Sequence, residues 1–188
     1  SEHQEAITTL WARFSEVAAK NPYAWQPQAH TPELLQQVND ENRMISAPYS
    51  KLLCANMQVD LASGIIVTSV AAAEAAGVDQ SKWVFLHAGA AAYDEWFVSE
   101  RGDLADSPAI RRIGEAALEH AGIGIDDVKH VDLYSCFPVA VQVGAAALGL
   151  PLDDPERPLT QTGGLTFAGG PGNNYGGHGV AQLVTKLR

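Results

Sequence analysis

The chain has 188 residues, of which 46% are hydrophobic and 18% charged, and its formal net charge is −10. This length and composition fit one globular unit with a hydrophobic core, or a large part of a bigger one. The acidic balance argues against a nucleic-acid-binding surface, which needs a basic stripe, but not against a ligand with a few phosphates.

The first half of the chain begins with an amphipathic helix. Residues 5–18 place five apolar side chains on one helical face, and Asn21-Pro22 ends the helix: these side chains are Ile7, Leu10, Trp11, Phe14 and Val17. A polar surface loop follows, with a short helical stretch at 32–38. The β-branched run at 64–70 predicts a buried strand, and residues 71–76 predict a short helix that stops at Gly77.

The second half alternates further strands and helices. Residues 83–89 and 130–134 predict strands, and residues 90–106 predict a loop. Ser107-Pro108 predicts the start of a helix that ends at Gly122, because a cap residue precedes proline at the first helical position. Another helix is expected from Pro138 to Leu148, and a last one ends near Leu187 after a glycine-rich stretch. This alternation predicts an α/β fold.

Cysteine content and hydropathy bear on the compartment. Cys54 and Cys136 are the two cysteines, and neither a secretory leader nor a dense cysteine framework supports a disulfide. We expect reduced thiols in a cytoplasmic protein. The longest nearly apolar run, 137–150, is too short and too interrupted to span a bilayer, so no membrane association is expected.

Cys136 lies just before a helix that is apolar on every side except at Gln142, and such a helix should be buried between layers. The unpaired amides and positive dipole end of a helix start stabilise a thiolate and bind oxyanions. Cys136 is therefore a candidate reactive thiol. The alternative is a small buried hydrophobic residue at a strand-to-helix corner. For Cys54 a core or strand position is favoured.

The stretch from Gly163 to Gly179 contains eight glycines. Glycines permit positive φ and close approach of the backbone to a ligand or to other backbone. No Gly-Lys-Ser/Thr follows, and no strand-turn-helix with an acidic partner fits, so neither a Walker A motif nor a dinucleotide fingerprint is present. A ligand-binding turn and a tight structural loop both remain open. His178, near a helix start, is either a structural donor or a catalytic group.

Together these segments resemble the thiolase superfamily, and most closely the sterol-carrier-protein-type thiolases and actinobacterial thiolase-like acetyl-CoA acetyltransferases. Tyr134-Ser135-Cys136-Phe137 resembles the family's His-Asp-Cys-Phe motif, and Gly169-Gly170-Pro171 resembles its Gly-His-Pro loop. Residues 56–64 resemble the segment that leads into the last strand of the family's first half. The resemblance covers about residues 42–188.

The resemblance implies a thiolase-like α/β fold with layers in the order αβαβα, of which this chain covers the C-terminal half and the end of the first half. Residues 1–41 would then end a loop domain. Residues 42–80 would supply the last strand and helix of the first half, and residues 81–188 an incomplete second half. The resemblance implies a homo-oligomer or the missing half of the fold as the partner, and no nucleic acid.

The implied function is that of an acyl-CoA acyltransferase of lipid metabolism, which performs Claisen condensation or its reverse. Acyl-CoA, a coenzyme A thioester, would be the substrate, with no permanently bound cofactor and no metal. The implied catalytic residues are Cys136 as acid/base, together with Tyr134 and His178. The implied substrate-binding residues are Gly169, Gly170, Gly172, Asn173 and Asn174.

The chain departs from the family at several positions. The nucleophilic cysteine of the first half lies outside this segment, Gly170 stands where the family has a histidine, and Tyr134-Ser135 replaces a His-Asp pair. Asn173, Asn174 and His178 are candidate substitutes. Two other functions therefore stay open. One is a thiolase-like protein that binds acyl-CoA without condensing it, and the other is a carbon–carbon lyase that uses Tyr134 for proton transfer.

Overall fold

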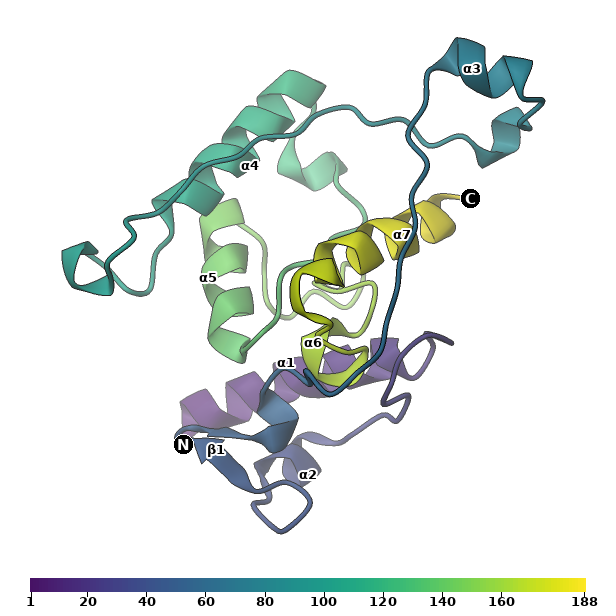
Figure 1. The fold of residues 1–188 in the computed structure, drawn as a ribbon. Helices are drawn as coiled ribbons and strands as arrows, with labels where there is room; N and C mark the ends of the chain where they lie inside the picture. Colours follow the sequence, from purple (N-terminus) through teal and green to yellow (C-terminus); the bar gives the residue numbers. More distant parts are fainter.

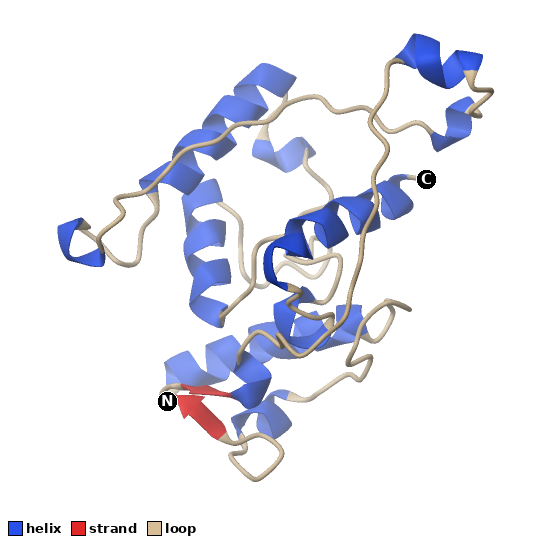
Figure 2. Ribbon diagram, in the orientation of Figure 1, coloured by secondary structure: helices blue, strands red, loops and turns tan.

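The structure, a computed structural model, describes all of residues 1–188. Helices make up most of it, and its only strands form one short hairpin (Figures 1 and 2). The helices are α1 (Glu2–Ala18), α2 (Pro32–Gln36), α3 (Val70–Ala75), α4 (Pro108–Ala121), α5 (Pro138–Leu148), α6 (Gly164–Phe167) and α7 (Tyr175–Leu187). The hairpin pairs β1 (Met44–Ser46) antiparallel with β2 (Tyr49–Ser50).

Single 3₁₀ turns complete the regular structure: η1 (Lys51–Leu53), η2 (Gln80–Lys82), η3 (Val98–Glu100), η4 (Ile125–Asp127) and η5 (Gly172–Asn174). None of the helices combines the length and the hydropathy that crossing a bilayer requires.

The first helix lies at the centre of the core. The predicted amphipathic helix is confirmed, and it buries Ile7, Trp11 and Phe14. The Trp11 ring stacks on Phe14 with a centroid distance of 4.9 Å, and its indole N–H donates to the Thr166 hydroxyl over 3.1 Å. The same core takes in Val141 of α5 and Phe167 of α6. The two ends of the chain thus share one hydrophobic core.

The segment from Gln161 to Gly170 is buried at every residue. Gly163 makes this possible, because its φ is +103° and an added Cβ would lie 2.6 Å from the Ala18 Cα. The Asn21 side chain then fixes the contact by donating to the Thr162 carbonyl over 2.9 Å. The glycine-rich segment therefore packs backbone against backbone on the C-terminal end of α1.

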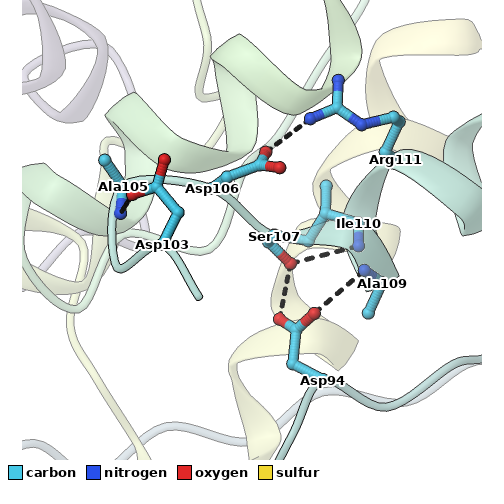
Figure 3. A network of polar contacts seen from close by, with 8 residues as sticks. All are labelled: Asp94, Asp103, Ala105, Asp106, Ser107, Ala109, Ile110 and Arg111. Atoms are coloured by element: carbon cyan, nitrogen blue, oxygen red, sulfur yellow. Dashed lines mark hydrogen bonds and ion pairs between the residues drawn. The ribbon is translucent and has the colours of Figure 1, made fainter. Parts of the chain in front are cut away.

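The cap of α4 is built as the sequence predicts and is anchored by the preceding loop (Figure 3). The Ser107 hydroxyl accepts from the Ile110 amide at 3.2 Å, and Gly122 ends the helix with φ +70°. Asp94 accepts from the Ser107 hydroxyl at 2.6 Å and from the Ala109 amide at 2.9 Å. These bonds, that from Ser107 above all, lower the pKa of the Asp94 carboxyl. A carboxylate at a helix start also offsets the positive end of the dipole.

Helix α5 has the predicted bounds, and within this chain it is buried along one side only. Val141, Ala145 and Ala147 are buried, whereas Val139 is 44% exposed. The helix packs on α1 and α4 along one side. No element of this chain covers the other side, although its residues are equally apolar. An apolar helix predicts burial, but it does not say which chain segment provides the cover.

The predicted strands at 64–70, 83–89 and 130–134 are not formed as strands. Residues 57–69 and 84–97 donate no backbone–backbone hydrogen bond, and within 130–134 such a bond is donated by Leu133, to the Leu159 carbonyl over 2.9 Å. A β-branched run favours extended backbone, but a strand exists only where another strand supplies the ladder. The chain thus shows extended segments in place of the expected layered sheets.

Large apolar side chains on these extended segments are exposed: Ile66 is 94%, Leu86 78% and Trp96 82% exposed. The short helix α3, between two of these segments, stands away from the other helices (Figure 1). Large exposed apolar surfaces mark binding sites for proteins, membranes or ligands, or places prone to aggregation.

The last helix begins earlier than predicted. The sequence assigns the whole stretch up to Gly179 to a loop, but α7 starts at Tyr175 and includes Gly176, Gly177 and Gly179. Burial of Tyr175 and Gly179 against the rest of the chain outweighs the low helix propensity of glycine. Close contact is part of this packing, because an added Cβ at Gly179 would lie 3.2 Å from the Asp132 carboxylate.

A buried carboxylate, Asp132, ties α7 to the segment before α6. It accepts hydrogen bonds from the Gln161 amide at 2.7 Å, the Thr162 amide at 3.2 Å, the Thr160 hydroxyl at 3.1 Å and the Tyr175 hydroxyl at 2.9 Å. Burial raises the pKa of Asp132, and the four hydrogen bonds oppose that rise. Burial and the nearby negative charge of Asp132 likewise raise the pKa of Tyr175 well above its usual range.

Replacing Gly163 tests the close approach to α1. In Gly163→Ala the new methyl group meets the Ala18 backbone and sits at a positive φ, so we expect the free energy of unfolding to fall by about 3 kcal/mol. The matched control is Gly176→Ala, because nothing lies within 4 Å of an added Cβ there. That variant should keep or slightly raise the stability. Urea denaturation followed by circular dichroism measures both, and equal stabilities would contradict the packing.

Removing the carboxylate tests the Asp132 network. Asp132→Ala leaves two backbone amides and two hydroxyls without their acceptor, so we expect a loss of about 3 kcal/mol or more in the free energy of unfolding. The control is Asp126→Ala, at an exposed position, which should change stability by less than about 0.5 kcal/mol. Thermal unfolding of the two variants measures the difference in their stability. A loss no larger than that of the control would show that the network carries little of the stability.

Candidate functional site

Residues 135–137, here called the Cys136 turn, run from the buried Ser135 to the start of α5 at Pro138. Cys136 and Cys54 are both free and half-buried. Burial raises the pKa of the Cys136 thiol, although hydrogen bonding to the Phe137 and Cys136 backbone opposes the rise. The helix start therefore does not bring the pKa of Cys136 below its usual value. Desolvation outweighs the helix start, so Cys136 is a neutral thiol at neutral pH.

Two of the first three residues of α5 offer no free amide, which weakens the effect of the helix start. Pro138 has no N–H, and the Ala140 amide donates to the Phe137 carbonyl at 3.1 Å. Within these three residues, the expected oxyanion site therefore has Val139 as its remaining amide.

Cys54 and Tyr49 stand beside Cys136, and the sequence did not indicate this. The Tyr49 ring stacks on Phe137 with a centroid distance of 5.5 Å. Burial raises the pKa of Tyr49, and the charges of the Cys54 and Cys136 thiolates add to the rise. Burial also raises the pKa of Cys54, whose thiol donates to the Ser50 carbonyl at 3.3 Å. Because this neighbourhood joins segments far apart in the chain, no local motif could have revealed it.

Residues 55 and 56 connect the Cys136 turn to residues 164–174, here called the glycine-rich turn. The Ala55 amide donates to the Cys136 carbonyl at 3.0 Å, and the Asn56 amide donates to the Leu165 carbonyl at 3.0 Å. The Gly170 amide in turn donates to the Asn56 carbonyl at 2.8 Å. The two motifs predicted from the sequence are therefore held on one extended segment.

Gly170, the position of the family histidine, is buried and closely packed. An added Cβ would lie 3.3 Å from the Asn56 carbonyl oxygen and 3.4 Å from the Ala55 Cβ. A side chain there would push against residues 55 and 56. The glycine allows the short approach that the hydrogen bond to Asn56 requires.

The amides of the glycine-rich turn are mostly engaged within it. The Gly172 amide donates to the Gly170 carbonyl at 2.8 Å, and the Asn174 amide donates to the Pro171 carbonyl at 3.3 Å. The Gly169 amide makes a long bond of 3.4 Å to Gly164. Asn173 is exposed. As it stands, the turn presents a shaped backbone surface rather than a row of free donors.

A pocket of about 280 Å³ lies on the other side of this turn, between α7 and residues 61–64. Gly169 and His178 line it, and Cys136 does not. Asn174 braces one wall by donating to the Leu61 carbonyl at 3.2 Å and accepting from the Ser63 hydroxyl at 2.8 Å. Its amide nitrogen lies 3.5 Å from His178 Nε2. The structure thus brings Gly169, Asn174 and His178 together, apart from the thiol of Cys136.

Tyr134 is 57% exposed, and its ring meets Tyr175 edge-on at a centroid distance of 5.8 Å. Tyr175 and Asp132 escaped the sequence analysis, since each looks ordinary in its own segment. No group of three or more histidine, cysteine, aspartate or glutamate side chains is arranged to hold a metal ion.

Neither family models nor curated protein sequences match the chain. Among solved structures, it is similar to a monomeric SCP2-thiolase-like protein type 1 from Mycobacterium smegmatis, with 41% identity and a TM-score of 0.86. That similarity covers 98% of this chain and 41% of that one. An Ltp2–ChsH2(DUF35) aldolase shares the fold, with a TM-score of 0.72 and 18% identity over 95% of this chain and 49% of that one.

The chain therefore spans less than half the length of either protein. The order of its motifs, the meeting of the Cys136 and glycine-rich turns, and the identity over nearly its whole length agree with one another. The chain belongs to the thiolase superfamily, among its SCP2-thiolase-like members.

Proposed function

We propose that the chain is part of a thiolase-type acyl-CoA acyltransferase, which makes or cleaves the carbon–carbon bond of a β-ketoacyl thioester. The observation that carries this proposal is the pairing of residues 55 and 56 with both the Cys136 turn and the glycine-rich turn. A shared segment holds the candidate acid/base next to the backbone against which a thioester would lie. The similarity to an SCP2-thiolase-like protein supports the same class of chemistry.

Cys136 would move the proton at the α-carbon of the substrate. In the cleavage direction its S–H bond breaks as the α-carbon gains a proton, and in the condensation direction the thiolate removes that proton. A neutral, half-buried thiol is suited to the first role. Gly169, Gly170, Gly172, Asn173 and Asn174 would shape the thioester-binding surface. His178 would contribute from the adjoining pocket, where Asn174 holds its position.

The layered αβαβα architecture is proposed for the assembled protein. The amides of residues 57–69 and 84–97 donate no backbone hydrogen bond, as in strands without neighbours, and one side of α5 is apolar and uncovered. We infer that residues 81–188 form most of the second half, that residues 42–80 end the first, and that residues 1–41 close the loop domain. The similar SCP2-thiolase-like protein is monomeric. This favours the other half of the fold, rather than a second copy of the chain, as the partner that covers these surfaces.

A carbon–carbon lyase that acts on CoA thioesters is the second candidate. Its support is the exposed Tyr134, whose ring rests on the buried Tyr175 next to the Cys136 turn. A tyrosine held in this way can transfer a proton while Cys136 only packs. One protein of the same fold is an aldolase.

Turnover of acetoacetyl-CoA by the full-length protein separates these functions. Transferase chemistry predicts cleavage that depends on added CoA and falls by about 100-fold or more in Cys136→Ala, because the acid/base is lost. Tyr134→Phe should then retain most of the activity. Release of acetyl-CoA can be followed by chromatography.

Two other outcomes would contradict the transferase. Cleavage of a β-hydroxyacyl-CoA into acetyl-CoA and a free aldehyde or ketone, without added CoA and lost in Tyr134→Phe, would establish the lyase. Saturable CoA binding in calorimetry, without turnover in either direction, would identify a binding protein. The variant Asp126→Asn, at an exposed position remote from the Cys136 turn in the chain, is the control for preparation-dependent losses.

A further inference from the structure

Three chain segments meet at the Cys136 turn, and three hydrogen bonds join each segment to the other two. The Ala55 amide donates to the Cys136 carbonyl at 3.0 Å, and the Asn56 amide donates to the Leu165 carbonyl at 3.0 Å. The Leu165 amide donates to the Ser135 hydroxyl oxygen at 3.1 Å and closes the ring. Because each segment is held by both of the others, none of them can rotate about a single contact.

Ser135 contributes the one side chain among these three hydrogen bonds, since the other two join backbone to backbone. Ser135 is fully buried and Leu165 is 3% exposed, so water does not reach the bond between them. Without the hydroxyl, the Leu165 amide would be buried and unpaired. The Cys136 turn and Leu165 would then be connected through residues 55 and 56 alone.

The Ser135 hydroxyl also takes the place of a cap on α6. This short helix begins after Gly163, which has no side chain that could accept from the first amides. The Gly164 amide donates to the Thr162 hydroxyl at 3.0 Å, and the Leu165 amide depends on Ser135, which lies 30 residues earlier in the chain. The serine thus ties the Cys136 turn to the start of the glycine-rich turn.

Gly164 leaves the space that the serine occupies. An added Cβ at Gly164 would lie 2.8 Å from the Ser135 hydroxyl oxygen and 2.6 Å from the Phe14 ring. The backbone of Gly164 has a φ of +78°, which favours glycine. The glycine-rich turn is therefore shaped to receive this hydroxyl at close range.

We propose that Ser135 is a positioning residue, whose hydroxyl fixes the Cys136 sulfur relative to the glycine-rich turn by closing this ring of hydrogen bonds. The inference rests on the proposed function, in which the glycine-rich turn holds the thioester and Cys136 exchanges a proton with its α-carbon. Proton transfer requires the sulfur to stay within hydrogen-bonding reach of that carbon. Ser135 sets this distance through the backbone and touches neither the substrate nor the proton.

The first test is the steady-state kinetics of CoA-dependent acetoacetyl-CoA cleavage by the full-length protein carrying Ser135→Ala. We expect kcat to fall by about tenfold, because a small displacement of a proton donor slows the chemical step. KM should change by less than about twofold, because the groups that would bind the thioester are unaltered. Cys136 itself is kept in this variant.

Ser15→Ala is the matched control. Ser15 is fully buried too, and its hydroxyl also accepts from the amide of another segment, that of His30 at 2.8 Å. It belongs to α1 and takes no part in the ring. We expect a comparable fall in the midpoint of thermal unfolding, with kcat and KM unchanged. Both variants are assayed below their unfolding temperatures, so that lost stability alone does not lower the rate.

The second test needs no turnover. Iodoacetamide labels both thiols, and peptide mass spectrometry gives the ratio of Cys136 to Cys54 labelling at one pH. Cys54 is an internal reference, because its own bonds to the Lys51 and Ser50 carbonyls hold it outside the ring. In Ser135→Ala the loosened turn should raise this ratio by about twofold or more, and Ser15→Ala should leave it unchanged.

A kcat no lower in Ser135→Ala than in Ser15→Ala would overturn the inference, and so would a raised KM at unchanged kcat. An unchanged labelling ratio would overturn it as well, because Ser135 would then not act through Cys136. If the unaltered protein cleaves no thioester, the proposed function fails and the labelling ratio still decides. A raised ratio would then leave Ser135 as the residue that holds Cys136 in place.

Discussion

The packing of the glycine-rich segment on the end of α1 is the contact on which the rest of the structure depends. Gly163 brings one backbone directly onto another at Ala18, a spacing that any larger residue prevents. The residues just before Gly163, Gln161 among them, donate to the Asp132 carboxylate, and Thr166, just after it, accepts from the Trp11 indole of α1. The Cys136 turn follows, because Ser135 accepts from the Leu165 amide at 3.1 Å. The position of the thiol is thus set by a contact at the far end of the first helix.

Two electrostatic effects compete at Cys136, and their balance decides what chemistry the thiol can perform. A helix start favours the thiolate, but Pro138 has no N–H and the Ala140 amide is already bonded, so burial prevails. A protonated acid/base readily donates its proton, but the thiolate that remains must be stabilised. The polar surroundings of the sulfur therefore matter more than its place on the helix.

Local features of the fold could be predicted from the sequence, and long-range features could not. The cap at Ser107, the stop at Gly122 and the apolar face of α1 follow from interactions within a few residues, and all three are present. The strands at 64–70 and 83–89 are not formed because no second strand of the chain pairs with them. For the site, the motifs around Cys136 and Gly170 were found by resemblance. Tyr49, Cys54 and Asp132 were not, because their importance arises from neighbours that only the folded chain supplies.

The extended segments at 57–69 and 84–97 affect how easily proteases cleave the chain and how readily it aggregates. Proteases bind their substrates as extended strands, and an extended backbone whose amides donate no backbone hydrogen bond already has that shape. The same unpaired edges, with apolar residues such as Ile66 and Trp96 facing water, are templates for self-association. Whatever covers these edges in the assembled protein also protects it from cleavage and aggregation.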